Sequence, residues 1–282
     1  MRSSGALLPI CMAGLIAWLY GPVFRELWEV WETDPSYSHG FLIPIVAGYM
    51  IWIKWTPLSR TDRAPSFWGA LPVAVSLCLL LVGECLESVV AGTGGLFVKG
   101  ISFPLILSGL VVLLLGPSFL GLLGIPLSYL LFMVPLPGGI FKMLTMPLQD
   151  YTSRVTTSAL QLSGVPSFRE GNVIVLPSLS LGVVEACSGI RSLITLLALA
   201  SAAAVLLIPS DRRIAQVFVA LSAVPIAILT NAFRVTITGL MCHYWGTACA
   251  QGFYHDLAGW SVFVLAMSLL GIEVWLLRKL FG

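Results

Sequence analysis

Leu193-Ile-Thr-Leu-Leu-Ala-Leu-Ala-Ser-Ala-Ala-Ala-Val-Leu-Leu-Ile208 is a stretch without a charged residue, and it decides the class of fold. Together with the residues just before it, the stretch is long enough for a helix that crosses a lipid bilayer. Similar stretches recur along the chain, which is 58% hydrophobic and 10% charged. Water-soluble domains carry about 25% charged residues, so the composition excludes one. Because lipid offers the backbone no hydrogen-bond partner, we expect an all-α, polytopic membrane helix bundle.

The apolar stretches predict eight transmembrane helices within a single membrane-embedded domain that covers residues 1–282. The helices cover about residues 5–21, 37–53, 67–83, 101–116, 119–135, 187–208, 214–240 and 257–277. The first stretch is as short as a signal peptide, but no small-residue cleavage site follows it, so we interpret it as a retained helix. Only Gly116-Pro117-Ser118 separates the fourth span from the fifth, so one of these two spans is a candidate re-entrant segment.

The basic residues predict the orientation of the chain in the membrane. With a cytoplasmic N-terminus, the cytoplasmic segments contain Arg2, Lys54, Arg60, Arg63, Arg212, Arg213, Arg278 and Lys279. The positive-inside rule therefore favours two cytoplasmic termini. The opposite side carries an acidic excess, to which Glu26, Glu84 and Glu87 belong. A net charge of +2 without a basic tail gives no reason to expect a nucleic-acid partner.

The longest segment outside the predicted spans covers residues 136–186, on the outer side. Apolar residues recur there at helical spacing, which predicts an amphipathic helix on the membrane surface: Leu144, Leu148, Tyr151, Val155, Ala159 and Leu162. Gly164-Val165-Pro166 should end this helix. Residues 172–176 and 179–184 are expected to form two short extended segments about Pro177-Ser178, which lead to Cys187.

Cys187 lies at the predicted N-terminal end of the sixth span. The positive end of a helix dipole favours the thiolate, which is the nucleophilic form of cysteine. A cysteine in a membrane helix is more often a small apolar filler, and Cys11 and Cys78 fit that interpretation. Cys242 and Cys249 share an outer loop, and the sequence leaves open whether they form a disulfide or stay free.

Arg234 lies inside the seventh span, on the same side of the membrane as Cys187. A charged residue in a span costs about 2.5–3.5 kcal/mol on insertion scales, and such residues usually mark a function. The alternative is an arginine that reaches the interface or pairs with a buried carboxylate. Asn231 lies one turn earlier on the same face and could hydrogen-bond within a polar site. Arg191, four residues after Cys187, is a second candidate cation.

His255 opens the eighth span, again at the outer face. A histidine there can exchange protons near neutral pH, although an interfacial polar role is the alternative. The neighbouring Asp256 is a plausible helix N-cap. His39 and His243 show no spacing typical of metal ligands, so we predict neither a metal nor a cofactor. Cys187, Arg234 and His255 together would supply a nucleophile, a cation that stabilises an oxyanion, and a general acid–base.

The motifs Glu185-Ala-Cys187-Ser-Gly and Asn231-Ala-Phe-Arg234, followed by His255, resemble the exosortase/archaeosortase family of membrane-embedded sorting enzymes. Ser36-Tyr-Ser-His-Gly-Phe-Leu-Ile-Pro44 and Arg169-Glu-Gly-Asn172 resemble it too. The resemblance implies a cysteine protease or transpeptidase of the inner membrane, with its site at the periplasmic face and Cys187, Arg234 and His255 as catalytic residues. It also implies protein substrates with a C-terminal tail made of a Pro-Glu-Pro-like motif, a membrane helix and a basic end.

Two alternatives remain open at this stage. The first is a membrane transporter or an assembly scaffold for exopolysaccharide export, without peptidase activity. A transporter should carry ionisable groups near the middle of the membrane, whereas this chain concentrates them at one face. The second is acyl or glycosyl transfer to a lipid or polysaccharide at the same outer site. The substrate, the acceptor and the oligomeric state are not fixed by the sequence.

Overall fold

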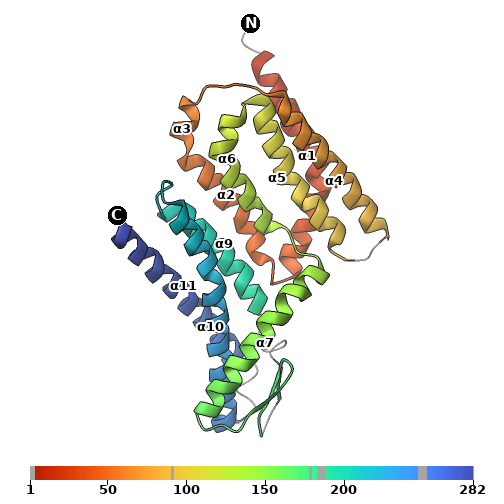
Figure 1. Cartoon of the computed structure of the whole chain (residues 1–282). Coiled ribbons are helices and arrows are strands. Elements are labelled where there is room, and N and C mark those ends of the chain that lie inside the picture. The colour runs from red at the N-terminus through yellow and green to blue at the C-terminus, as the bar shows by residue number, and fades with distance from the viewer. Residues whose placement is uncertain (1–3, 90–91, 178–179, 183–188, 247–252, 282) are drawn as a thin grey trace. The chain divides into compact units, whose positions relative to one another are not determined.

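The computed structural model describes residues 4–89, 92–177, 180–182, 189–246 and 253–281, with side chains described outside 4–10, 189–192, 253–258 and 281 (Figure 1). The chain divides into two compact units, Met1–Gly138 and Gly139–Gly282, and each is described by itself. Helices dominate both units, which confirms the predicted all-α membrane architecture. The prediction of a single domain over the whole chain remains a prediction.

The first unit is built around a helical hairpin. Its elements are α1 (Ser4–Thr33), η1 (Ser38–Phe41), α2 (Leu42–Ile53), α3 (Trp55–Arg60), η2 (Phe67–Gly69), α4 (Ala70–Val89), α5 (Gly94–Leu114), α6 (Pro117–Tyr129) and η3 (Leu130–Met133). Helices α4 and α5 pack along their lengths, and glycines allow the close approach. A Cβ atom at Gly109 would lie 2.8 Å from the backbone nitrogen of Val73, so a larger residue there would push the hairpin apart.

Hydrogen bonds and ion pairs connect α1 to this hairpin. The Tyr20 hydroxyl lies 2.9 Å from the hydroxyls of both Ser76 in α4 and Ser102 in α5. Nearer the end of the hairpin, the fully buried Lys99 ammonium lies 2.7 Å from Glu26 and 2.6 Å from Glu87. Because a buried ammonium is costly without counter-charges, these carboxylates are what allow Lys99 to occupy the inside of a membrane protein.

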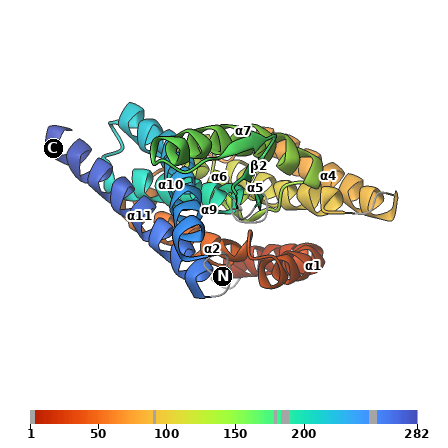
Figure 2. The same ribbon diagram turned by 90° about the horizontal axis from the view of Figure 1, so that it is seen from below.

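The second unit contains a three-helix bundle. Its elements are α7 (Gly138–Leu162), β1 (Phe168–Glu170), β2 (Val173–Val175), β3 (Ser180–Gly182), α9 (Gly189–Leu207), α10 (Arg213–Trp245) and α11 (Phe253–Phe281). Helices α9, α10 and α11 lie side by side (Figures 1 and 2). Their shared core is rich in small residues and contains Leu196, Ala200, Ala204, Val219, Ala223, Ala227, Ala266 and Leu270. Alanine lets helix backbones approach closely, so van der Waals packing can hold the bundle in lipid.

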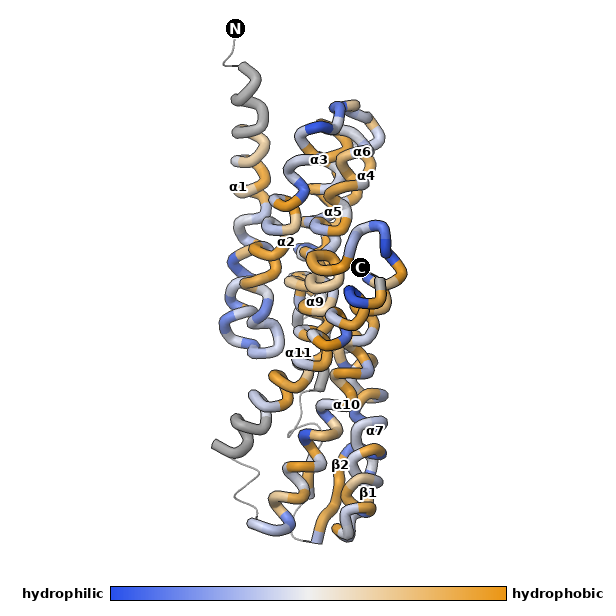
Figure 3. Tube along the Cα trace, turned by 90° about the vertical axis from the view of Figure 1, so that its left-hand side faces the viewer, coloured by the Kyte–Doolittle hydropathy of each residue, from blue (hydrophilic) through white to orange (hydrophobic). Residues whose placement is uncertain are grey.

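The predicted number of eight spans is not confirmed, although the chain is a multi-pass membrane protein. Among the described residues, four helices are long and apolar enough to cross a bilayer: Phe67–Val89, Gly94–Leu114, Arg213–Trp245 and Gly259–Leu280 (Figure 3). The number rises to five if Pro117–Met133 and Gly138–Leu162 form one bent span. The segments Ser38–Ile53 and Leu193–Leu207 are shorter apolar helices. The 12 residues of α2 span about 18 Å at 1.5 Å per residue, less than the hydrocarbon core of about 30 Å.

Candidate active site

Helix α7 corresponds to the predicted amphipathic helix, and one of its faces is buried. The side chains that it buries are mainly hydroxyls and include Thr152, Ser153 and Thr156. The Thr156 hydroxyl donates a hydrogen bond to the carbonyl of Ala232 in α10, at 3.3 Å. Half of the predicted apolar stripe is exposed, namely Leu144, Tyr151 and Leu162. The other half is partly buried and consists of Leu148, Val155 and Ala159. The exposed apolar side chains agree with the predicted contact between this helix and lipid.

The segment after α7 forms a three-stranded antiparallel sheet in the order β1-β2-β3. The two extended segments predicted about Pro177 are confirmed as β2 and β3, whereas β1 was not predicted. Gly171 and Asn172 join β1 to β2, with a positive φ of 62° at Gly171. A glycine next to asparagine before an apolar run is a hairpin signal, and it could have revealed β1. The sheet buries Ile174 and Leu181 against Leu160 of α7 and Val235 of α10.

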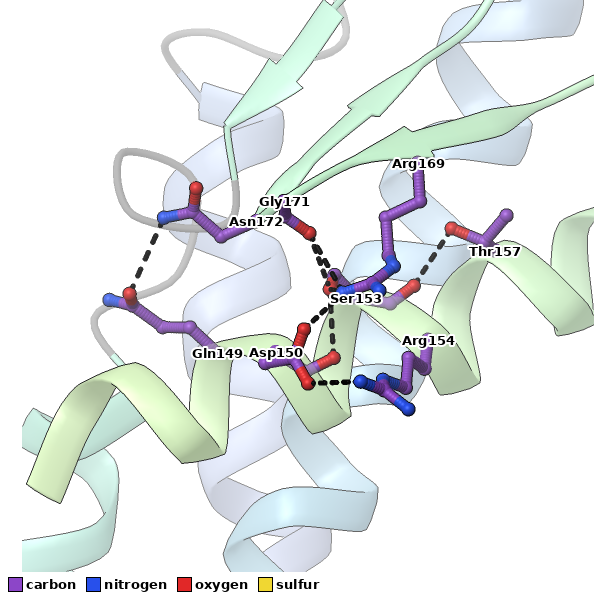
Figure 4. Close-up of polar contacts among 8 residues, drawn as sticks. All are labelled: Gln149, Asp150, Ser153, Arg154, Thr157, Arg169, Gly171 and Asn172. Atoms are coloured by element: carbon purple, nitrogen blue, oxygen red, sulfur yellow. Dashed lines mark hydrogen bonds and ion pairs between the residues drawn. The ribbon is translucent and has the colours of Figure 1, made fainter.

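A network of polar contacts holds the β1–β2 turn on α7 (Figure 4). The Arg169 guanidinium pairs with the Asp150 carboxylate and donates to the Gly171 carbonyl at 3.0 Å. Arg154, one turn after Asp150, contacts the same carboxylate at 2.9 Å. The Arg169 hydrogen bond is the main reason why the pKa of Asp150 lies below its ordinary value. The motif Arg169-Glu-Gly-Asn172 therefore docks the hairpin on the helix that precedes it.

Arg234 of α10 reaches the first turns of α11. It is half-buried, and a Cβ atom built on Gly259 would lie 3.6 Å from Nη2 and 3.8 Å from Cζ of Arg234. The guanidinium therefore lies against Gly259. Residue 255 is four positions before Gly259, one helical turn away on the same face of α11. Arg234 therefore contacts α11 one helical turn after position 255.

The other predicted catalytic positions are described only in part. Cys187 lies outside the described residues, and α9 begins two positions later, at Gly189. For His255 and Arg191, the structure describes the backbone as helical but not the side chain. The predicted proximity of Cys187, Arg234 and His255 therefore remains a prediction. The same holds for the pairing of Cys242, which is buried, with Cys249, which lies outside the described residues.

The two remaining histidines lie elsewhere. His39 belongs to the first unit, where its Nε2 lies 3.2 Å from the carbonyl oxygen of Phe132. His243 makes an edge-to-face contact with Tyr244 near the end of α10. Within the described residues, no three side chains of His, Cys, Asp or Glu gather into a group that could hold a metal ion.

A small pocket lies between α7, α9 and α10. Its lining residues are Thr145, Leu148, Gln149, Thr152, Leu193, Ala227, Ile228 and Asn231. Asn231, three residues before Arg234, is 7% exposed, and Thr152 is 2% exposed. Leu193 lies one turn beyond Gly189, close to the N-terminal end of α9. The pocket therefore adjoins the helix end that follows Cys187 and the helix that carries Arg234.

Comparison with known proteins found no match to a curated protein or to a solved structure. A family model described as transmembrane exosortase matches residues 31–272. The matched range covers most of the chain and includes Cys187, Arg234 and His255. It also includes three of the four described helices that are long and apolar enough to cross a membrane, and the first part of the fourth, Gly259–Leu280. This multi-pass membrane protein therefore belongs to the transmembrane exosortase family.

Proposed function

We propose that the protein is a membrane cysteine protease or transpeptidase that cleaves the C-terminal sorting tail of exported proteins. Membership of the exosortase family supports this proposal. The observation that carries it is the contact between the Arg234 guanidinium and Gly259, one turn from His255. A cation held beside a candidate acid–base is what acyl transfer from a peptide requires. The substrate tail would contain a Pro-Glu-Pro-like motif, a membrane helix and a basic end.

The proposed reaction proceeds through a thioester. The Cys187 thiol transfers its proton to His255, and the sulfur bonds to the scissile carbonyl carbon. Arg234 stabilises the negative charge that develops on the carbonyl oxygen. The C–N bond then breaks as His255 returns the proton to the leaving amine. Water or an amine acceptor attacks the thioester, releases the thiol and determines whether the outcome is hydrolysis or transfer.

The site is proposed to face the periplasm from the inner membrane, with both chain termini in the cytoplasm. The distribution of basic residues supports this orientation, because Arg212, Arg213, Arg278 and Lys279 flank the bundle at the end opposite to Gly259 along α10 and α11. The exposed apolar side chains Leu144, Tyr151 and Leu162 of α7 support a position of this helix on the membrane surface. Helix α7 and the sheet would then border the groove that receives the substrate motif.

The test is a cleavage assay in proteoliposomes that contain the full chain and a reporter protein with the tripartite tail. Cys187→Ala should leave the reporter at full length, because no other residue takes over as nucleophile. Cys78→Ala is the matched control, since Cys78 is exposed on α4, and this variant should cleave normally. Both variants must insert to the same level as the wild type. Normal processing by Cys187→Ala would refute the mechanism.

Thiol alkylation separates the enzyme from a transporter or scaffold for exopolysaccharide export. A catalytic Cys187 should react with iodoacetamide faster than an ordinary thiol at neutral pH, since the thiolate is the reactive form. Arg234→Ala should slow this reaction, because it removes a positive charge that favours the thiolate. Equal rates at Cys187 in both proteins would favour the non-enzymatic alternative. Labelling the new substrate terminus would separate hydrolysis from transfer to a lipid or polysaccharide.

A further inference from the structure

The pocket between α7, α9 and α10 contains polar groups without partners. Within the part of the chain that the structure describes, neither the Asn231 amide nor the Thr152 hydroxyl forms a hydrogen bond. Both residues are more than nine-tenths buried, and both line the pocket. Among the described residues, the fully shielded side-chain atoms without a partner are Ser167 Oγ and Glu273 Oε1, so the polar atoms of Asn231 and Thr152 keep accessible surface in the pocket that they line. Two such groups at one small pocket can pair with a group that enters it.

The size and lining of the pocket restrict what that ligand can be. The empty space has room for about one water-sized group, so a side chain of the substrate cannot enter. No charged residue is among the lining residues, so the pocket is not built for an ion. The Asn231 amide and the Thr152 hydroxyl can both donate a hydrogen bond. A single neutral acceptor, such as a carbonyl oxygen, satisfies both donors.

We propose that Asn231 and Thr152 form a subsite that binds one main-chain carbonyl of the substrate next to the scissile bond. The inference rests on the proposed peptidase function. Asn231 lies one turn before Arg234 on the same face of α10, and Leu193 of the same pocket lies one turn after the start of α9. A carbonyl in this pocket would therefore belong to a peptide that also passes the N-terminal end of α9 and Arg234.

The physical need for such a subsite follows from the chemistry of cleavage near a membrane. A peptide bond can be attacked only where the chain is extended, and an extended chain lacks the internal hydrogen bonds of a helix. In an apolar environment, each backbone carbonyl that has lost its helical hydrogen bond needs another hydrogen-bond donor. Asn231 and Thr152 supply such donors from two helices that the Thr156–Ala232 hydrogen bond already joins. The substrate can then stay extended at the scissile bond.

The experiment compares Asn231→Leu and Thr152→Val, which keep the side-chain size and remove the hydrogen-bonding group. Thr236→Val is the matched control, because the Thr236 hydroxyl donates within its own helix to the Ala232 carbonyl at 2.8 Å. Cleavage of the tailed reporter by full-length enzyme in proteoliposomes gives kcat and KM. Each test variant should raise KM by about ten-fold with kcat nearly unchanged, as expected for a contact present in both ground and transition states. The control should match the wild type.

A double-mutant cycle sharpens the test. If both groups bind the same carbonyl, the double variant should raise KM less than the product of the single effects. The alkylation rate of Cys187 by iodoacetamide should stay unchanged in all variants, because that small reagent does not use the subsite. A role in folding alone would lower the amount of inserted enzyme and would not change KM selectively.

The outcomes separate this inference from the proposed function. If the wild type cleaves and Cys187→Ala does not, but both test variants keep the wild-type KM, the pocket holds only a water molecule and the inference is wrong. If the wild type does not cleave, the proposed function fails, and binding of a fluorescent tail peptide to Cys187→Ala becomes the readout. Weaker peptide binding after Asn231→Leu would then support the subsite. Unchanged or absent binding would overturn it.

Discussion

Replacing Gly259 with valine should remove most of the activity without unfolding the protein. A Cβ atom at Gly259 would lie 3.6 Å from the Nη2 atom of Arg234, which is an ordinary van der Waals distance. Alanine therefore fits. Valine carries two methyl groups about 1.5 Å beyond the Cβ and has one strongly preferred rotamer in a helix, so the guanidinium must move.

The size of the effect follows from the role proposed for Arg234. Losing one group that stabilises an oxyanion typically lowers kcat by about 10²–10³, or about 2.7–4 kcal/mol of transition-state stabilisation. Gly259→Val should approach this loss, and Gly259→Ala should keep a rate close to that of the wild type. Alanine should also stabilise α11 slightly, because glycine costs about 1 kcal/mol in a helix interior.

The assay is the first-order cleavage rate of the tailed reporter, measured at saturating enzyme in proteoliposomes. Gly271→Val is the matched control, since Gly271 lies in the same helix and a Cβ atom there would meet nothing within 4 Å. It applies the same change in helix propensity without touching Arg234. If Gly259→Val cleaves as fast as Gly271→Val, the position of Arg234 against α11 does not matter for the reaction, and the assignment of Arg234 is wrong.

Two further predictions concern the parts that hold each unit together. Lys99→Ala should lower the free energy of unfolding by about 1.5–3 kcal/mol, because the partly exposed Glu26 and Glu87 would lose charge-assisted hydrogen bonds, and thermal unfolding in detergent should show no comparable loss for the exposed Lys142→Ala. The Asp150–Arg169 pair should stabilise the hairpin fully at pH values above the ordinary pKa of aspartate, which is about 3.9. This stabilisation should disappear as the pH falls through the lowered pKa of Asp150. The protection factors of the backbone amides in residues 168–175, corrected for the pH dependence of intrinsic exchange, should therefore fall at acidic pH in the wild type, and an equal fall in Asp150→Asn would contradict the prediction.

The sequence predicted the elements whose pattern is local. Periodic apolar residues from Leu144 to Leu162 predicted α7, and the extended runs about Pro177 predicted β2 and β3. Strand β1 was missed because three residues with two charges have no apolar alternation, and only the turn at Gly171 marks it. The buried face of α7 also could not be predicted, since threonine and serine hydroxyls carry no hydrophobic periodicity. They become buried because partners such as the Ala232 carbonyl meet them.

The candidate site shows the same division between local and long-range information. The chemical types of Cys187, Arg234 and His255 could be recognised from the sequence, because a charge within a membrane helix and a thiol near a helix start are local signals. The contact between Arg234 and Gly259 depends on how α10 packs against α11, and no residue near Arg234 in the sequence indicates it. The polar pocket at Asn231 likewise needs three helices, which only the tertiary structure brings together.

The buried basic residue of the first unit bears on the transporter alternative. Lys99 is fully buried, and carboxylates of Glu26 and Glu87 contact it directly near one end of the α4–α5 hairpin. Transport would require an ionisable group that changes partners near the middle of the membrane, whereas this ammonium is fixed by strong ion pairs at a helix end. Arg234, by comparison, is half-buried and lies against Gly259 of α11. A lysine that ion pairs hold in place suits a structural role, not that of a group which changes partners during transport.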